Sequence, residues 1–247
     1  MENRQQHFLK GALILSIAGG LSKVLGAVYR IPLGRLLGGE GIGLYQMAYP
    51  IYTAILALAT AGIPVAISVL VARKETEGYT GDSERIFKVA LIMLSIFGAL
   101  LTLSVMKGAG FIAREVLNEP RAYYPIMAVA PAIFFSGILS VFRGYFQGHQ
   151  SMMQTAVSQV VEQLFRVTAV VFLAILLYPR GLEYSASGAT FGAVIGGMAG
   201  LIVLLVFYKK FKKSAANLGA KLVYSGASAW SLAKDLVRLA VPVSLGA

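Results

Sequence analysis

Two cationic side chains, Lys23 and Arg30, lie within a long apolar stretch near the start of the chain. If residues 9–29 form one helix, Lys23 is about 20 Å from Lys10 along its axis, near the middle of a hydrocarbon layer about 30 Å thick. Arg30 follows two turns later on the same helix face. A charge in mid-bilayer costs from about 2.5 to above 10 kcal/mol, so we expect this face to line a cavity. The alternatives are an internal ion pair and snorkelling, which suits Arg30 at the helix end better than Lys23.

A carboxylate and a guanidinium lie four residues apart in a later apolar segment, where every fourth residue is polar: Gln154, Ser158, Glu162 and Arg166. Because the acid precedes the base by one helical turn, Glu162 and Arg166 are able to form an ion pair inside the membrane. In the alternative, Glu162 exchanges between Arg166 and a cation or proton. Together with Lys23 and Arg30, these residues leave an excess of about two positive charges, which suits a pyrophosphate group in a low-dielectric cavity.

A second polar track runs along the segment between residues 44 and 71, at steps of three or four residues: Gln46, Tyr49, Thr53, Ala57, Thr60, Pro64 and Ser68. Such a track either faces the same cavity or allows neighbouring helices to approach closely, and the residues leave both interpretations open. Pro50 and Pro64 remove backbone donors, so we expect a kink or an unwound turn in this segment.

The composition is that of a membrane protein with several spans. Hydrophobic residues make up 57% of the chain and charged residues 13%, with a mean hydropathy of +0.72, whereas soluble domains carry about 25% charged residues. The net charge of +11 lies mostly between the apolar segments, so we attribute it to membrane orientation and not to nucleic-acid binding. The chain has no cysteine, only His7 and His149, and no phosphate-binding loop of the GxxxxGKS/T type. We therefore expect no enzyme, no catalytic residue and no metal or cofactor site.

Six apolar segments reach the roughly 20 residues that a spanning helix needs: residues 9–33, 44–71, 86–106, 123–146, 152–178 and 187–208. We predict an all-α, polytopic membrane protein in which residues 1–208 form an amino-terminal six-helix transmembrane lobe. Residues 209–234 are predicted to be a basic cytoplasmic linker between two lobes. Residues 235–247 are predicted to begin a seventh helix, which is too short to cross, so we expect the chain to be truncated.

Most basic residues fall on one side of the predicted spans. The N-terminus, the second and fourth connections and the tail after residue 208 carry them, with Arg143 in the fourth connection. The opposite side has only Arg35, Lys107, Arg114, Arg121 and Arg180. Because cytoplasmic loops carry the excess of Lys and Arg, we predict a multi-pass protein of the cell membrane with a cytoplasmic N-terminus.

The chain resembles the polysaccharide-exporter branch of the multidrug/oligosaccharidyl-lipid/polysaccharide (MOP) flippase superfamily in four runs: LSKVLGAVYRIPLGRLLGGEGIGLYQMAYP, AGIPVAISVLVA, RGYFQGHQSMMQTAVSQVVEQLFRV and LAVPVSLGA. Within that branch it is similar to the stage V sporulation protein B-like group, which is related to the MurJ-type lipid II flippases. The resemblance extends from about Leu9 to Ala247. It implies a protein of roughly twice this length, with two six-helix lobes around a central cavity, as in other MATE-like transporters.

The resemblance also implies which residues bind substrate. In these flippases, basic residues of the first helix face the cavity and hold the pyrophosphate of an undecaprenyl-linked sugar. Lys23 takes the place of the arginine in the family's S-R/K-V-L-G motif, and Arg35 matches a later basic residue of the same segment. Arg30 lies one residue past the next family arginine, which aligns with Tyr29.

The predicted substrate-binding residues are Lys23, Arg30, Arg35, Gln46, Thr53 and Arg166, with Glu162 and Arg166 as an ion-coupling or structural ion pair. The predicted function is translocation of an undecaprenyl-pyrophosphate-linked oligosaccharide across the cytoplasmic membrane by alternating access. Its expected partners are the anionic lipid-linked sugar, membrane lipids and a carboxyl-terminal lobe, with no nucleic acid. Leu56 and Ala57 stand where lipid II flippases carry arginine, which argues against lipid II itself as the cargo.

Two other functions remain open. A multidrug cation antiporter of the same superfamily needs a buried carboxylate, and Glu162 is the only acid within the predicted spans, whereas the first helix offers cations. In a non-transporting membrane scaffold for cell-wall or spore assembly, the polar tracks only pack helices together.

Overall fold

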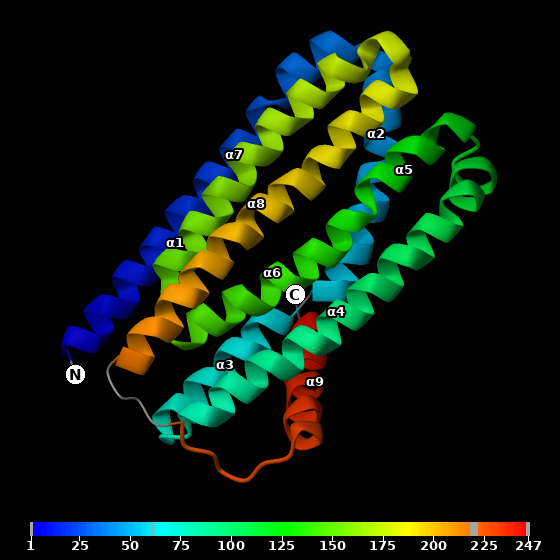
Figure 1. Ribbon diagram of the computed structural model, residues 1–247. Helices are drawn as coiled ribbons and strands as arrows, with labels where there is room; N and C mark the ends of the chain where they lie inside the picture. The colour runs from blue at the N-terminus through cyan, green and yellow to red at the C-terminus, as the bar shows by residue number, and fades with distance from the viewer. Residues whose placement is uncertain (1, 61, 218–221, 246–247) are drawn as a thin grey trace.

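Helices make up nearly all of the structure. The computed structural model describes residues 2–60, 62–217 and 222–245, and no β-strand occurs in these ranges. Its α-helices are α1 (Glu2–Val28), α2 (Arg30–Thr60), α3 (Ile63–Thr76), α4 (Thr80–Phe111), α5 (Tyr123–Val129), α6 (Pro131–Gly148), α7 (Met152–Leu177), α8 (Leu182–Asn217) and α9 (Ala229–Leu245). Short helical turns are present at Ile112–Val116, Pro120–Ala122 and Tyr178–Arg180. The predicted all-α class is confirmed, and Figure 1 shows most of the long helices side by side.

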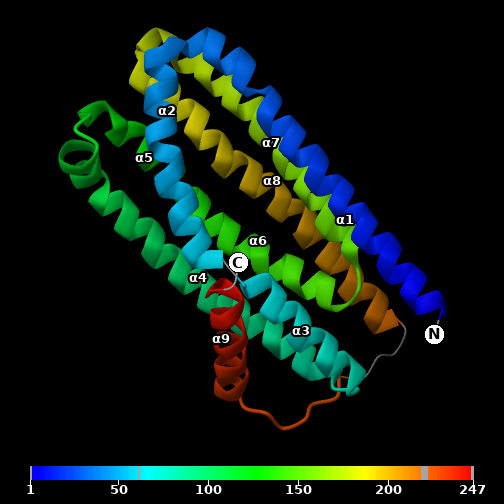
Figure 2. The same ribbon diagram turned by 180° about the vertical axis from the view of Figure 1, so that it is seen from behind.

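The first apolar stretch folds back on itself at Gly38. Five stretches are long and apolar enough to cross a membrane, and the first of them covers Leu13–Ala57. Gly38 adopts φ +65° and ψ −174°, a conformation that only glycine reaches without a steric penalty. The chain continues past α1 into the start of α2, reverses, and returns through the rest of α2 (Figures 1 and 2). This stretch therefore makes two passes, in agreement with the six predicted.

The second pass consists of the part of α2 after Gly38 and of α3, which is a separate helix. Gly62, just before α3, has φ +70°, and Pro64 lies in the first turn of α3, where a missing N–H disturbs no helical hydrogen bond. The predicted interruption of this segment is confirmed here. At Pro50, in contrast, α2 continues without a break, although the proline nitrogen has no hydrogen to donate to the carbonyl of Gln46.

The two helix boundaries that flank the predicted linker differ from those predicted. α8 continues to Asn217 and does not end at residue 208, because the Lys and Ala residues that follow favour helix. α9 begins at Ala229 and not at residue 235, with Ser228 as its N-cap, whose Oγ accepts from Ser231 N at 3.1 Å. Residues 218–221 of the predicted linker and residues 246–247 of the predicted seventh helix lie outside the described residues.

Glycines of α8 bring its backbone against α7. A Cβ at Gly188 would lie 2.8 Å from Leu173 O, and one at Gly196 would lie 2.7 Å from both Glu162 O and Arg166 Cβ. Small residues at such spacing allow two helices to approach closely in a membrane. From this contact the Arg166 side chain reaches a cavity lined by α1 and α2, and the carboxylate of Glu162 reaches Arg143 of α6.

The largest apolar core lies between α3, α4, α6 and α8, where Ile67, Phe142 and Leu204 are buried. A second buried cluster, which includes Tyr45 and Val170, joins α2, α7 and α8. This second cluster fixes the positions of the helices that carry the predicted site residues.

Candidate substrate-binding cavity

Glu162 of α7 is held between two guanidiniums. Its Oε1 accepts from Arg166 Nη2 at 2.5 Å, and its Oε2 accepts from Arg143 Nη2 of α6 at 2.6 Å. Arg143 Nε also donates to Ser158 Oγ at 3.2 Å. The side chains of Arg143, Glu162 and Arg166 are 18%, 12% and 20% exposed. Water therefore screens these charges weakly, and their hydrogen bonds are charge-assisted and short.

The prediction that Arg143 belongs to a connection between spans is wrong. Arg143 lies inside α6, which continues to Gly148, and its guanidinium is directed at Glu162. A signal was present in the sequence, because Ser136, Ser140 and Arg143 recur on one helix face. The partner, however, lies on another helix, and spacing along a single segment does not reveal such a contact.

Three of the predicted site residues, Lys23, Arg30 and Arg166, line one cavity of about 380 Å³. We call it the cation cavity. Its walls come from the end of α1, the start and middle of α2, and α7, and consist of Ser22, Lys23, Gly26, Ala27, Tyr29, Arg30, Tyr49, Gln163 and Arg166. Helical spacing brings Lys23 and Arg30 to the same side of the first pass, and Gly26 between them lets Gln163 of α7 approach. Cations from two different passes therefore meet at one space.

Polar atoms in the wall of the cation cavity lack partners. Arg166 Nε and Ser22 Oγ are buried and make no hydrogen bond within the described part of the chain. A guanidinium has five N–H donors, and Glu162 engages only one side of this one. Because these two atoms are themselves inaccessible, it is the cations lining the cavity, Lys23, Arg30 and Arg166, that make it favour an anion.

A second cavity of about 400 Å³ adjoins the first and shares Arg30 and Tyr49 with it. We call it the tyrosine cavity. Its lining comes from α2 alone and consists of Arg30, Leu33, Gly34, Ile42, Tyr45, Gln46, Tyr49 and Pro50. The hydroxyls of Tyr45 and Tyr29 are 2.7 Å apart, which joins the walls of the two cavities by a buried hydrogen bond.

The other predicted site residues do not line the cation cavity. Gln46 is exposed in the tyrosine cavity. Thr53 is half-buried, and its hydroxyl donates to Pro50 O at 3.1 Å, so its own helix occupies it. Arg35 is exposed and lines neither cavity. Glu162 stands behind Arg166 and does not line the cation cavity itself.

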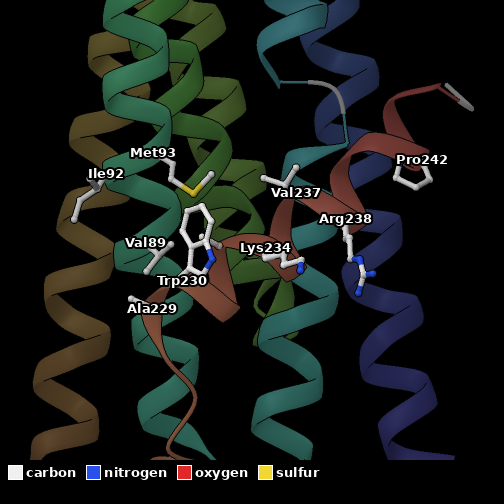
Figure 3. A pocket seen from close by; sticks show the side chains of 10 residues that line it. Val89, Ile92, Met93, Ala229, Trp230, Lys234, Val237, Arg238 and Pro242 are labelled. Carbon is white, nitrogen blue, oxygen red and sulfur yellow. The ribbon is translucent and has the colours of Figure 1, made fainter.

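An apolar groove of about 910 Å³ lies away from these residues, between α4 and α9. Figure 3 shows its lining, in which Trp230 lies close to Met93 and Val89. Its charged lining side chains are Lys234 and Arg238, and none of the predicted site residues reaches it. The groove therefore lacks the converging polar groups that the cation cavity has.

Comparison with known proteins identifies relatives over most of the chain. Residues 8–232 match the model of a family described as polysaccharide biosynthesis protein. Stage V sporulation protein B of Bacillus subtilis (strain 168) is 39% identical over 210 residues, which are 85% of this chain and 40% of that protein. Lipid II flippase MurJ of the same organism is 32% identical over 256 residues, 95% of this chain and 47% of that protein. The chain thus spans about half the length of these relatives.

The fold also matches a solved transporter. A MOP superfamily transporter from Pyrococcus furiosus Vc1 superposes with a TM-score of 0.71 at 18% identity. The match covers 96% of this chain and 52% of that one. The helical arrangement is therefore that of about half of a MOP superfamily transporter.

Proposed function

The chain belongs to the polysaccharide biosynthesis protein family, and from this premise we propose that it forms one lobe of a flippase for an undecaprenyl-pyrophosphate-linked oligosaccharide. The observation that carries the proposal is the cation cavity, where Lys23, Arg30 and Arg166 line one space. In this proposal the protein lies in the cytoplasmic membrane with its N-terminus in the cytoplasm. Alternating access between this lobe and a second one moves the head group across.

The charge balance of the site favours a diphosphate. Lys23, Arg30, Arg143 and Arg166 carry four positive charges against the one negative charge of Glu162, a net of +3 (4 − 1). This exceeds the excess of two expected from the sequence, because Arg143 was assigned to a connection. Guanidinium and ammonium groups bind phosphate oxygens by charge-assisted hydrogen bonds, and Lys23 and Arg30 are exposed and therefore open to such a ligand.

The surroundings of the cavity suit a lipid-linked head group. Leu13, Ile17, Leu21 and Val24 of the first pass are exposed, so apolar surface for a prenyl chain lies on the same helix as Lys23. The head group then occupies the cavity while the tail stays in the bilayer. A cationic drug is disfavoured, because Glu162, the carboxylate bonded to Arg166, is already shared by two arginines.

Substitution of the cavity cations tests the proposal. We expect Lys23→Ala and Arg30→Ala, each made in the whole protein, to reduce translocation of an undecaprenyl-pyrophosphate-linked sugar by tenfold or more. Each removes a charged hydrogen bond of about 1.5–3 kcal/mol, and about 1.4 kcal/mol is tenfold in affinity. The measurement is flipping of the labelled lipid in reconstituted vesicles.

Arg114→Ala is the matched control, because Arg114 is an exposed cation that lines neither cavity. It should leave both transport and the amount of protein in the membrane unchanged. Normal flipping by both Lys23→Ala and Arg30→Ala would contradict the proposal and leave the scaffold function as the better explanation.

A further inference from the structure

The tyrosine cavity has an aromatic wall beside its polar groups. The rings of Tyr45 and Tyr49 stack with centroids 6.1 Å apart and an interplanar angle of 25°. Tyr45 is only 6% exposed and its hydroxyl is bonded to that of Tyr29, so its ring is a fixed support. Tyr49 is half-buried and lines both cavities. The negatively charged face of such a ring attracts the polarised C–H groups on the apolar side of a sugar ring.

Hydrogen-bonding groups lie on the same part of α2. The side-chain amide of Gln46 is exposed in the tyrosine cavity and supplies both donors and an acceptor. Pro50 also lines this cavity, and because it has no N–H, the backbone carbonyl of Gln46 lacks its ordinary helical partner. Sugar hydroxyls need donors and acceptors together with an apolar surface, and this short segment offers all three.

The two cavities lie next to each other, as the diphosphate and the first sugar do in a glycosyl diphosphate. They meet at Arg30 and Tyr49, and each has a volume of about 400 Å³ or slightly less, within the range of about 300–1,000 Å³ that small-molecule sites occupy. In a glycosyl diphosphate the first sugar is bonded directly to the phosphate. A diphosphate at Lys23, Arg30 and Arg166 therefore places that sugar next to Tyr49.

We propose that the tyrosine cavity binds the first sugar ring of the lipid-linked oligosaccharide, with Tyr49 stacked on the ring and Gln46 bonded to its hydroxyls. This inference rests on the proposed function, which it extends from the diphosphate to the sugar. A cationic ligand does not fit the aromatic wall, because Arg30 at the junction of the two cavities repels it. The tyrosine cavity therefore makes the site select glycosylated lipid over bare lipid diphosphate.

Binding of two lipids by the whole protein in nanodiscs tests the inference. The probes are undecaprenyl diphosphate and undecaprenyl diphosphate that carries one N-acetylglucosamine. The unmodified protein should bind the glycosylated lipid more tightly. Tyr49→Leu and Gln46→Leu should each weaken binding of the glycosylated lipid by about two- to tenfold and leave the bare lipid unchanged. Tyr49→Phe keeps the ring and should retain the preference.

Tyr178→Leu is the matched control, since Tyr178 is an exposed tyrosine that lines neither cavity, and it should change neither affinity. Equal affinity of the unmodified protein for both lipids overturns the sugar site alone. An equal loss for both lipids in Tyr49→Leu overturns it too, because the residue then only shapes the cavity. Failure to bind either lipid overturns the proposed function itself.

Discussion

Arg143 determines how much of the positive charge of Arg166 is left for a ligand. Glu162 accepts from both guanidiniums, at 2.6 Å from Arg143 and 2.5 Å from Arg166. If Arg143 were absent, Glu162 and Arg166 would form a neutral pair. Because Arg143 shares the carboxylate and is fixed by Ser158, the three residues keep a net positive charge behind the cation cavity.

We expect Arg143→Met to destabilise the protein by about 1.5–3 kcal/mol, because Glu162 keeps Arg166 as its partner but loses one of its two charged hydrogen bonds. The measurement is the free energy of unfolding in detergent. Arg143→Lys keeps the charge and loses the second donor, so its loss should be smaller. It should also retain more of the affinity for undecaprenyl diphosphate than Arg143→Met does.

Arg180→Met removes an exposed arginine after α7 and serves as the control for Arg143→Met. If Arg143→Met and Arg180→Met were equally stable, Arg143 would have no structural part in the ion pair. A double-mutant cycle with Glu162→Gln gives the coupling directly, since residues in contact do not behave additively.

At the residue scale, the sequence predicted the contacts and shared faces that arise within a single helix. Lys23 and Arg30 share a face because their spacing is close to two turns, and Glu162 pairs with Arg166 because they are one turn apart. The contact of Arg143 with Glu162 joins α6 to α7 and depends on how these helices pack. Thr53 has the spacing of a cavity residue, yet its hydroxyl donates to the backbone carbonyl of Pro50, one turn earlier in the same helix.

At the element scale, the glycines of α8 determine where α7 presents Glu162 and Arg166. A Cβ at Gly196 would lie 2.7 Å from Glu162 O and 2.7 Å from Arg166 Cβ. These are a backbone atom and the first side-chain atom, and neither can rotate away. The two helices can accept a methyl group at this point only by moving apart.

We expect Gly196→Ala to destabilise the protein by about 1–3 kcal/mol, the usual cost of overpacking. It should also weaken lipid diphosphate binding, because the displaced α7 carries Arg166 out of the cation cavity. Thermal unfolding in detergent and binding of undecaprenyl diphosphate are the two measurements.

Gly110→Ala in α4 is the control for Gly196→Ala, because nothing lies within 4 Å of a Cβ at Gly110. Alanine favours helix over glycine by about 1 kcal/mol, so this change should leave stability equal or slightly higher. Equal behaviour of the two alanine variants would show that α7 and α8 are packed loosely enough to absorb the methyl group.

The passes themselves were predictable, because about 20 apolar residues specify a membrane helix whatever its neighbours are. The residues at which the helices begin and end were less predictable. Apolarity stops near residue 208, but α8 continues to Asn217 on residues that favour helix in water. The third predicted span begins at residue 86, whereas α4 begins at Thr80, and Asp82 in its first turn bonds to Ser225.

At the scale of the whole molecule, residues 222–228 form a strap between the lobe and α9. The strap lies against the start of α4, beyond the lower ends of α3 and α4 in Figure 2. Gly81 N donates to Val223 O at 2.8 Å, and the guanidinium of Arg85 lies 4.5 Å from the ring centre of Tyr224. α9 then packs on α3 and α4, so the strap ties the helix that follows it to this lobe.

Asp82 is the centre of this attachment. Its side chain is fully buried, and its Oδ2 accepts both the backbone N–H of Ser225, at 3.1 Å, and the hydroxyl of the same residue. A buried carboxylate forms such bonds more strongly than a neutral acceptor does. We expect Asp82→Ala to leave both donors of Ser225 unpaired and to release the strap.

Hydrogen exchange of the whole protein measures this release. A hydrogen bond to a charged group contributes about 1.5–3 kcal/mol, so the Ser225 amide should exchange at least about tenfold faster in Asp82→Ala. Asp235→Ala, at an exposed position of α9, should leave that rate unchanged. Exchange at α7 should be the same in both variants, because the cavities lie away from the strap. Unchanged protection of Ser225 in Asp82→Ala would mean that Tyr224 and the backbone bonds hold the strap, and that Asp82 does not fix α9 to the lobe.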